Sequence, residues 1–406
     1  MINIAILGFG IVGGGIAEVI EENGGIIKDR LGRSMYVKYI LDLRDFPDSP
    51  YGDRVVHDIS VIVNDPEVDI VCEAMGGSHP ALEFSLACMN AGKSVVTSNK
   101  EVVAKHGVEL LTCAKDNDVS YLYEAAVGGG IPVLRSLRTS LASDKINAIT
   151  GILNGTTNYI LTAMDKNGAD FETVLKEAQK LGYAEANPSA DVDGIDAKRK
   201  IIILTAIATG LLVPDESVYA ETMTKVSRAD MDAAKRFGGT VKLLGRFKRV
   251  QDKLSVMVSP FFVPANCPLA GVNDVFNGVM ADCAMTGEVM YYGRGAGRYP
   301  TAAAMVSDVF AIASGAFASE YPAMWDAADA DVVLPIGGQS FRCYMRIKNA
   351  DSAGVCDKAS EILGDVTVLA GAPAGYTEII TGVVANDAAM AAAEALGAES
   401  VIRILD

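Results

Sequence analysis

The sequence has 406 residues, and half of them are hydrophobic while about a fifth are charged, as in ordinary soluble proteins. This length is sufficient for two or three domains with a large core. The formal net charge of -16 argues against binding to nucleic acid and against attraction to anionic membranes. The longest apolar segments are shorter than the roughly 20 residues that a membrane span requires. We therefore expect a soluble protein of the cytoplasm.

The seven cysteines lie at positions 72, 88, 113, 267, 283, 343 and 356, without a CxxC pair. No histidine lies near enough to them in the sequence to suggest a zinc site. A short β pattern begins directly after Met1, so a signal peptide is not expected. These features predict reduced thiols in a reducing compartment.

A buried-strand pattern over residues 2–7 is followed at once by a glycine-rich turn and then by a helical pattern. This is the strand, turn and helix context that a GxGxxG sequence needs for dinucleotide binding. Gly8 allows the tight turn, Gly10 lets the backbone approach a pyrophosphate, and Gly13 lets the helix pack close to the strand. The N-terminus of the helix supplies free N–H groups for the phosphates. The predicted cofactor-binding residues of this turn are Gly8, Phe9, Gly10, Ile11, Val12 and Gly13.

The second predicted strand, residues 37–41, ends at Asp42, with Arg44 two residues further on and Arg54 beyond it. An acid at this strand end usually accepts from the ribose 2′-hydroxyl of NAD. A nearby arginine instead accommodates the 2′-phosphate of NADP. Because both residue types are present, the residues themselves leave NAD and NADP open.

Two further predicted strands, residues 68–72 and 92–97, are followed by Glu73 and by Ser98-Asn99-Lys100. In doubly wound sheets, ligands lie outside the carboxyl ends of the strands. Lys100 is therefore expected to point toward the cofactor crevice. Together with the glycine turn, these strands predict a doubly wound α/β nucleotide-binding domain of the Rossmann type over residues 1–130.

Three consecutive glycines, residues 128–130, come shortly after Glu124 and directly before a proline segment. Without side-chain cover, backbone carbonyls can be directed at a ligand here. A simple hinge between two domains also explains these glycines. Beyond them the pattern changes to helices alternating with strands, which predicts an α+β domain over residues 131–330. A second glycine-rich turn, residues 293–298, leads into a helix expected over 300–320.

The segment from Gly182 to Lys200 contains four acids and a proline and runs directly into a long apolar stretch. The apolar stretch predicts a buried helix. If that helix starts near Gly194, Asp196 and Lys200 stand four residues apart on one face. Buried charges in such a place are costly unless they are paired or used in chemistry.

Residues 338–406 read as strand, helix, strand, strand, helix and strand. This βαββαβ order predicts a ferredoxin-like domain. Asn349 lies at the first turn between strand and helix.

The segment that contains Ala178, Gly182-Tyr183, Asn187-Pro188, Asp191-Val192, Gly194, Asp196 and Lys200 resembles the homoserine dehydrogenase pattern at every specified position. Residues 97–100 resemble the Thr-x-Asn-Lys segment of that family, and residues 151–158 resemble its Gly-x-x-Asn-Gly-Thr-x-Asn segment. The resemblance implies the NAD(P)-dependent interconversion of L-homoserine and L-aspartate 4-semialdehyde in threonine, methionine and isoleucine biosynthesis. It also implies that residues 131–330 form the substrate and dimerisation domain and that the helix over 300–320 returns to the nucleotide domain.

By this resemblance, Lys200 and Lys100 share the acid/base work and bind the substrate, Asp196 holds the substrate hydroxyl or orients the lysine, and Glu185 takes the substrate ammonium. The family often uses NADP, which favours a role for Arg44 at the 2′-phosphate. Thr97, Lys100 and Gly295 are further expected cofactor contacts. The resemblance also implies a monovalent cation, Na⁺ or K⁺, on Glu124 and the carbonyls of Val127, Gly129 and Ile131.

The C-terminal domain resembles an ACT domain, the amino-acid-sensing module often attached to such enzymes, with L-threonine as the expected effector and Asn349 as the candidate residue. The family implies a homodimer or a homotetramer. Two alternatives are another amino-acid or semialdehyde oxidoreductase on the same plan and a catalytically dead ligand sensor. A dead sensor would require a broken lysine pair or glycine turn, and both are intact in this sequence.

Overall fold

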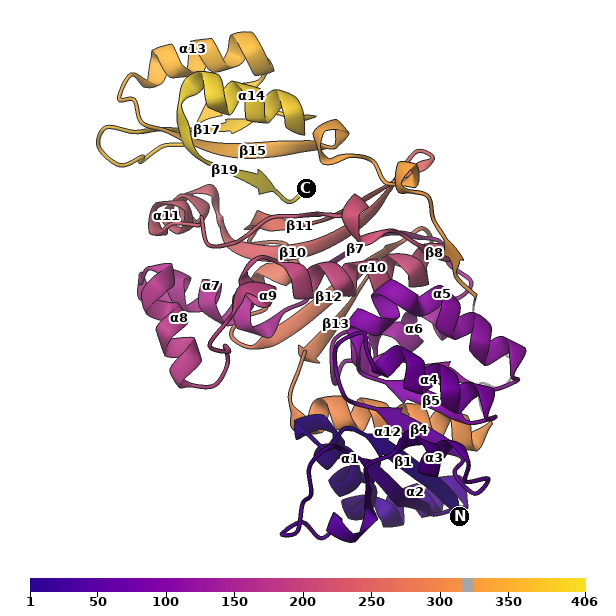
Figure 1. Ribbon diagram of the computed structural model, residues 1–406. Helices are drawn as coiled ribbons and strands as arrows, with labels where there is room; N and C mark the ends of the chain where they lie inside the picture. The colour runs from indigo at the N-terminus through magenta and orange to yellow at the C-terminus, as the bar shows by residue number, and fades with distance from the viewer. Residues whose placement is uncertain (316–323) are drawn as a thin grey trace. The chain divides into compact units, whose positions relative to one another are not determined.

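A computed structural model describes residues 1–315 and 324–406 (Figure 1). The chain divides into two compact units, and each is described by itself. The first unit comprises Met1–Ser143, Ile202–Asp215 and Gly293–Ala328, and the second comprises Asp144–Ile201, Glu216–Tyr292 and Asp329–Asp406. The three expected domains, 1–130, 131–330 and 338–406, remain a prediction. Residues 316–320 of the helix expected over 300–320 lie outside the described residues.

The first unit is built on a six-stranded parallel sheet with the strand order β3-β2-β1-β4-β5-β6. The order reverses direction at β1, as in a doubly wound α/β fold, which confirms the predicted fold class. The strands are β1 (Ile2–Leu7), β2 (Met35–Leu41), β3 (Val55–Val56), β4 (Ile70–Glu73), β5 (Ser94–Thr97) and β6 (Tyr121–Leu122).

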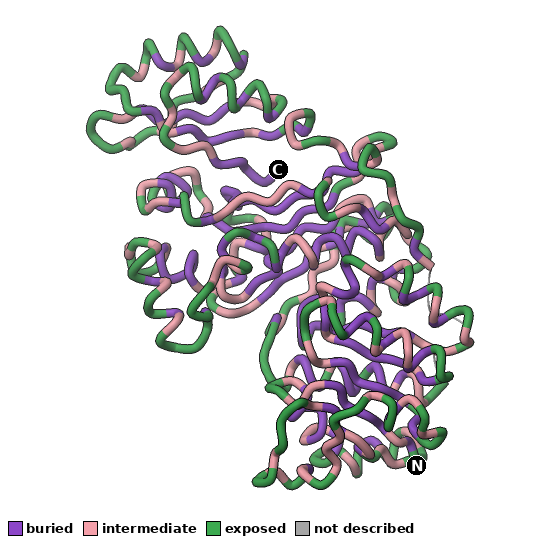
Figure 2. Tube along the Cα trace, viewed as in Figure 1, coloured by how far each residue is buried: buried purple, intermediate pink, exposed green. Residues whose placement is uncertain are grey.

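The helices of the first unit pack on this sheet because the central strands are apolar on both faces: Ala5 and Ile6, which point to opposite faces of β1, have no exposed surface. Figure 2 shows these strands as buried. Helix α12 packs on α1, where a Cβ on Gly15 would lie 3.1 Å from the Cβ of Ala302. The helices are α1 (Ile11–Glu22), α2 (Gly24–Leu31), α3 (Ile59–Val63), α4 (Ala81–Asn90), α5 (Lys100–Asp116), α6 (Val133–Thr139) and α12 (Arg298–Ser314). Two short strands, β8 (Leu211–Leu212) and β14 (Asp326–Ala327), pair with each other.

The second unit contains an 11-stranded mixed sheet whose main path is β13-β12-β7-β10-β11-β19-β15-β17-β16. A long hairpin of β10 and β11 forms its centre, and most of its residues are buried (Figure 2). The strands are β7 (Ile146–Ile152), β9 (Tyr219–Ala220), β10 (Gly239–Val250), β11 (Lys253–Pro264), β12 (Phe276–Cys283), β13 (Gly287–Arg294), β15 (Ser340–Ile347), β16 (Val366–Val368), β17 (Thr377–Thr381), β18 (Val384–Ala385) and β19 (Ala398–Ile404).

The helices of the second unit follow turns that their sequences specify. Asn154 accepts from Thr157 N and caps α7, and Gly168 ends that helix in the left-handed conformation. The Gly194 carbonyl accepts from Lys198 N, so that α10 begins at Ile195, close to the predicted start. The helices are α7 (Gly155–Asn167), α8 (Phe171–Lys180), α9 (Ser189–Val192), α11 (Arg228–Phe237), α13 (Ser352–Leu363) and α14 (Asn386–Leu396), together with α10 (Ile195–Thr209), which begins in this unit and continues into the first at Ile202.

The C-terminal segment has the predicted βαββαβ order, with its strands arranged as β19-β15-β17-β16. The third strand of this order is interrupted between β17, which ends at Thr381, and β18, which begins at Val384. Gly382 donates its N–H to Asp365 O at 2.7 Å, and the chain then pairs with the opposite end of β15 as β18. The segment also joins the central sheet, because β19 pairs with β11 through Phe261 and Phe262.

Candidate functional site

The glycine turn between β1 and α1 exposes the N-terminus of the helix. Gly8 has φ +90° and donates its N–H to Leu41 O at 2.8 Å. A Cβ on Gly13 would lie 1.9 Å from Gly8 O, so a side chain cannot be accommodated there. A Cβ on Gly10 would have no atom within 4 Å, so the first turn of α1 is open. The open turn fits a pyrophosphate bound by backbone N–H groups.

Asp42 at the end of β2 is tied to this turn and to Arg44. Its carboxylate accepts from Phe9 N at 2.8 Å and from Arg44 Nε and Nη2, both at 3.0 Å. The Arg44 guanidinium lowers the pKa of Asp42 to about 2. The acid is therefore ionised and largely neutralised by its neighbour. The two residues that the sequence left as alternatives form one pair.

A cavity of about 500 Å³ in the first unit lies beside the turn and this pair. His57 also lines it and was missed by the sequence analysis, because no motif marks it. Its Nδ1 lies 2.7 Å from Asp42 O and its Nε2 lies 3.1 Å from Asp45 Oδ1. The Asp42 carbonyl and the Asp45 carboxylate both raise the pKa of His57. The cavity is lined by Gly8, Gly10, Leu41, Asp42, Leu43, Arg44, His57, Ala74, Met75, Pro80 and Phe84.

The end of β5 carries Thr97 and leads into Lys100, the first residue of α5. Thr97 is fully buried, and its hydroxyl donates to Glu73 Oε2 at 2.6 Å and accepts from Asn99 N at 2.9 Å. Burial raises the pKa of Glu73. Asn99 caps α5, and Lys100 is half-buried beside it. Through Thr97, the Glu73 carboxylate therefore fixes the turn between β5 and α5, a role that the sequence analysis did not assign.

Glu124 lies shortly before the glycine segment, residues 128–130, in the first unit. Its carboxylate accepts from Leu134 N at 3.0 Å and from Arg135 N at 2.7 Å, and it is 6% exposed. Burial, followed by the nearby Asp308 carboxylate, raises the pKa of Glu124 to about 7. The predicted cation segment also contacts the second glycine turn, because a Cβ on Gly129 would lie 2.7 Å from Gly295 O.

Lys200 and Asp196 form a buried pair in the second unit. Lys200 Nζ donates to Asp196 Oδ2 and to Leu153 O, both at 2.7 Å. Asn154 Nδ2 donates to Asp196 Oδ2 at 2.8 Å and to Asp191 Oδ1 at 2.7 Å. Lys200 and Asp196 are 7% and 6% exposed. The pair predicted from the four-residue spacing is thus present, with Asn154 as an additional member that the sequence analysis did not assign to the site.

Glu185 and Lys100, the other residues predicted at the substrate, have surroundings of their own. Glu185 is exposed, and its backbone carbonyl accepts from Gln179 Nε2 at 3.0 Å. Lys100 belongs to the first unit and Lys200 to the second. The structure therefore describes each lysine in its own surroundings.

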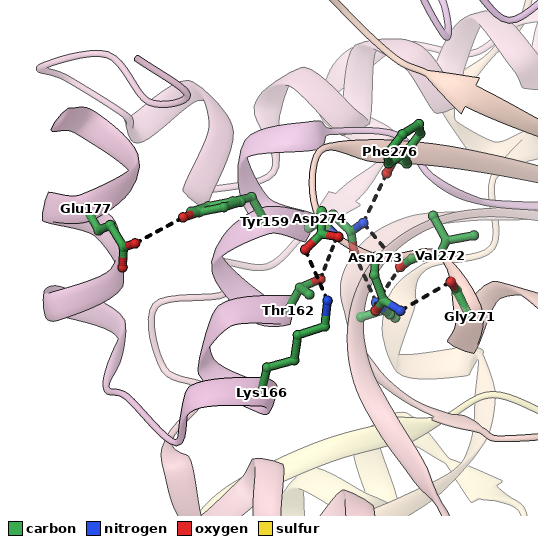
Figure 3. A network of polar contacts seen from close by, with 11 residues as sticks. Tyr159, Thr162, Lys166, Glu177, Gly271, Val272, Asn273, Asp274 and Phe276 are labelled. Atoms are coloured by element: carbon green, nitrogen blue, oxygen red, sulfur yellow. Dashed lines mark hydrogen bonds and ion pairs between the residues drawn. The ribbon is translucent and has the colours of Figure 1, made fainter. Parts of the chain in front are cut away.

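A second buried lysine, Lys242, lies on β10 and was also missed. Its Nζ donates to Val272 O at 2.5 Å, to Asn273 Oδ1 at 3.1 Å and to Asn158 Oδ1 at 3.2 Å. Figure 3 shows Val272 and Asn273 in the loop that faces α7. Asn158 belongs to the Asn-Gly-Thr-x-Asn segment, so Lys242 fixes the first turns of α7 from within the core.

The fold and the glycine turn place the first unit in the class of dinucleotide-binding α/β proteins. Residues 8–124 match the model of the homoserine dehydrogenase NAD-binding domain, and residues 132–310 match the homoserine dehydrogenase model. A homoserine dehydrogenase of Pseudomonas aeruginosa is 38% identical over 371 residues, which cover 90% of this chain and 86% of that protein. One of Synechocystis is 42% identical over 368 residues, which cover 87% and 84%.

Solved structures agree with these matches. A homoserine dehydrogenase from Thiobacillus denitrificans superposes with a TM-score of 0.89 and 35% identity, covering all of this chain and 98% of that one. A Staphylococcus aureus homoserine dehydrogenase gives 0.82 and 28%, with the same coverage. The chain therefore belongs to the homoserine dehydrogenase family. It is an oxidoreductase that uses NAD(P), and these matches do not favour the two alternatives.

In the described residues, no helix is both long and apolar enough to cross a membrane. All seven cysteines lie in the described part of the chain and are free thiols, four of them buried and three half-buried.

Proposed function

We propose that this protein interconverts L-homoserine and L-aspartate 4-semialdehyde, with Lys200 and Asp196 managing the proton at the reacting oxygen. One observation carries the proposal: in a chain of this family, the buried Lys200 Nζ lies 2.7 Å from Oδ2 of the buried Asp196. A buried amine with a defined partner is suited to acid/base work.

In the biosynthetic direction, the aldehyde carbon gains a hydride and its oxygen gains a proton. When bound, the nicotinamide supplies the hydride. Lys200 Nζ donates the proton to the developing alkoxide. Asp196 and the Leu153 carbonyl orient the ammonium, and Asn154 holds Asp196 in place. In the reverse direction, Lys200 accepts the hydroxyl proton.

Lys100 is proposed to share the acid/base work and to polarise the aldehyde oxygen, since it follows the carboxyl end of β5. Glu185 is proposed to bind the substrate ammonium, which its exposed carboxylate suits. Thr97, Lys100 and Gly295 remain proposed cofactor contacts. These roles rest on the resemblance of the motifs to those of the family.

NADP is the proposed cofactor, with Arg44 near the 2′-phosphate. The Arg44 guanidinium neutralises Asp42, so the acid no longer repels a phosphate at this strand end. His57 adds a second basic group beside Asp42. Replacing Arg44 with alanine should raise the KM for NADP while leaving that for NAD unchanged. Equal effects on both cofactors would contradict this role.

A monovalent cation is proposed at Glu124 and the carbonyls of Val127, Gly129 and Ile131. The donor set fits, because a buried carboxylate and backbone oxygens suit a hard cation. A cation would also compensate the buried charge of Glu124. Turnover is expected to fall when Na⁺ and K⁺ are replaced by choline at constant ionic strength.

The C-terminal segment is proposed to be an ACT-like module that binds L-threonine. Its βαββαβ order and strand arrangement support this assignment. At the first turn, the Asn349 side chain accepts from Asp351 N at 2.9 Å, and Thr377 Oγ1 donates to the Asn349 carbonyl at 2.7 Å. A cytoplasmic homodimer or homotetramer in threonine, methionine and isoleucine biosynthesis completes the proposal.

The first test is the absorbance of the reduced nicotinamide at 340 nm with L-homoserine, run in parallel with NAD and NADP. Turnover with either cofactor is expected. Adding L-threonine tests the effector, and a size measurement in solution tests the oligomer. Folded protein that turns over neither cofactor in the presence of Na⁺ or K⁺ would contradict the proposed reaction.

A further inference from the structure

The C-terminal strand β19 carries a buried arginine that is fully engaged by polar groups. The Arg403 side chain is 5% exposed. Nη1 donates to Glu221 Oε2 at 2.6 Å and to Ser259 Oγ at 2.8 Å. Nε and Nη2 both donate to Asn386 Oδ1, at 3.1 and 2.8 Å. A buried guanidinium requires such partners, because an unpaired interior charge is strongly destabilising.

Glu221 is held by β11 as well as by Arg403. Its N–H donates to Val258 O at 2.9 Å, and its Oε2 accepts from Ser259 Oγ at 2.9 Å. The guanidinium also lies 5.3 Å from the ring of Tyr219, which precedes Glu221 by two residues. The backbone and the side chain of Glu221 are thus fixed from different strands.

The two residues after Glu221 bind the end of α9. Thr222 Oγ1 and Met223 N both donate to Val192 O, at 3.1 and 3.0 Å. The last carbonyls of a helix have no partner within that helix, so external donors determine where such an end lies. Val192 is the final residue of α9.

Helix α9 leads directly into the acid/base pair. Asp191, one residue before Val192, is joined through Asn154 to Asp196, which holds Lys200. Between them, Gly194 has φ +76°, and a Cβ there would lie 3.0 Å from Val258 Cγ1. The chain is therefore packed closely against β11 over the same stretch that Glu221 binds.

We propose that Arg403 and Glu221 are positioning residues for the Asp196–Lys200 pair. Through their ion pair, the C-terminal strand β19 fixes residues 189–196, the segment that leads into this pair. The inference rests on the proposed role of Lys200. Contact runs continuously from Arg403 through Glu221, residues 222–223 and Val192 to Asp191. Loss of the ion pair frees this segment, and the lysine no longer meets the reacting oxygen in a fixed geometry.

The test compares Glu221→Gln, Arg403→Met and the double variant. Each single variant should lower kcat by about 2- to 30-fold, the range for mutations that modulate coupling between sites. The Kd for NADPH should not change, because the affected loop belongs to the other unit from the glycine turn. The double variant should be no slower than the slower single variant, since both residues act through one contact.

A matched control is Arg236→Met. Arg236 Nη2 pairs with Glu378 Oε2 at 2.6 Å, and this pair also joins a helix of the second unit to the C-terminal segment. Glu378 accepts a hydrogen bond from Tyr344 OH within the C-terminal segment, whereas Glu221 is followed directly by the residues that bind α9. The control variant should lose stability but retain the wild-type kcat at a temperature where it is folded.

Hydrogen–deuterium exchange supplies a readout that does not depend on activity. In Glu221→Gln, amides of residues 189–196 should exchange faster than in the wild type, and in Arg236→Met they should not. Should Glu221→Gln fail to fold, Thr222→Val removes one bond to Val192 O and should give a smaller change in the same direction.

Unchanged kcat and unchanged exchange in a folded variant would overturn the proposal, as would a lower kcat without faster exchange. Should wild-type protein fail to turn over homoserine, the proposed reaction would be wrong. In that case, faster exchange in residues 189–196 would still support the coupling of Arg403 to this loop.

Discussion

Lys200 and Lys242 are both buried, but their ammonium groups have different partners. Lys200 donates to the carboxylate of Asp196 and to one backbone carbonyl. Lys242 donates to one carbonyl and to two side-chain amide oxygens, which are all neutral. A lysine with a carboxylate partner on the same helix suits proton transfer. A lysine enclosed by neutral oxygens that join α7, β10 and the loop around Val272 suits structural support.

The largest expected effect comes from Lys200→Ala. Loss of a general acid should lower kcat by about 10²–10⁴-fold. The free energy of unfolding should change less, and the KM for NADP⁺ should stay near that of the wild type. Steady-state kinetics with L-homoserine measures this, with the exposed Lys176→Ala on α8 as the control. Near-normal turnover by folded Lys200→Ala would show that another group transfers the proton.

Lys242→Met should lower stability and leave turnover nearly unchanged, the opposite of Lys200→Ala. Two buried oxygens and one half-buried oxygen lose a donor, so the free energy of unfolding should fall by roughly 2–4 kcal/mol. Turnover per folded molecule should remain close to that of the wild type at a temperature where the variant is folded. Urea denaturation and kinetics together measure the two properties. A variant with wild-type stability but little activity would remove the distinction between the two lysines.

Asp196→Asn gives Lys200 a neutral partner in place of its carboxylate, as at Lys242. Hydrogen bonds to charged groups contribute about 1.5–3 kcal/mol, so kcat should fall by about 10- to 100-fold. In the variant, Asn154 Nδ2 should still donate to Asp191 Oδ1. Kinetics and the circular dichroism spectrum of the variant test this. An unchanged kcat would mean that the Asp196 carboxylate is not needed to orient the ammonium.

The smallest expected effect is on the pH dependence of stability. Burial lowers the pKa of Lys242 to about 8, whereas an unfolded lysine has a pKa near 10.4. Above pH 8 the unfolded chain binds more protons than the folded chain, so the contribution of Lys242 to stability rises with pH. The difference in free energy of unfolding between wild type and Lys242→Met should increase by about 1 kcal/mol from pH 7 to pH 9. A difference that falls with pH would contradict this assignment.

The glycine turn and the strands around it were predictable because they depend on local patterns. Gly8 and Gly13 permit conformations and contacts that a Cβ would prevent, and that requirement is visible in the residue types themselves. The spacing of Asp196 and Lys200 likewise fixes one face of one helix. The order of helices and strands in residues 340–404 follows from their alternating patterns for the same reason.

Only the tertiary structure decided the partners that come from distant parts of the chain. Asn154 reaches Asp196 across 42 residues, and Glu221 reaches Arg403 across 182. The burial of Lys242 and the pairing of β19 with β11 also depend on how the strands pack. A sequence pattern indicates which face of an element is apolar, but not which polar groups another element will bring to it. The sequence by itself therefore determined the nucleotide turn and the lysine–aspartate pair, and packing determined the groups that hold that pair in place.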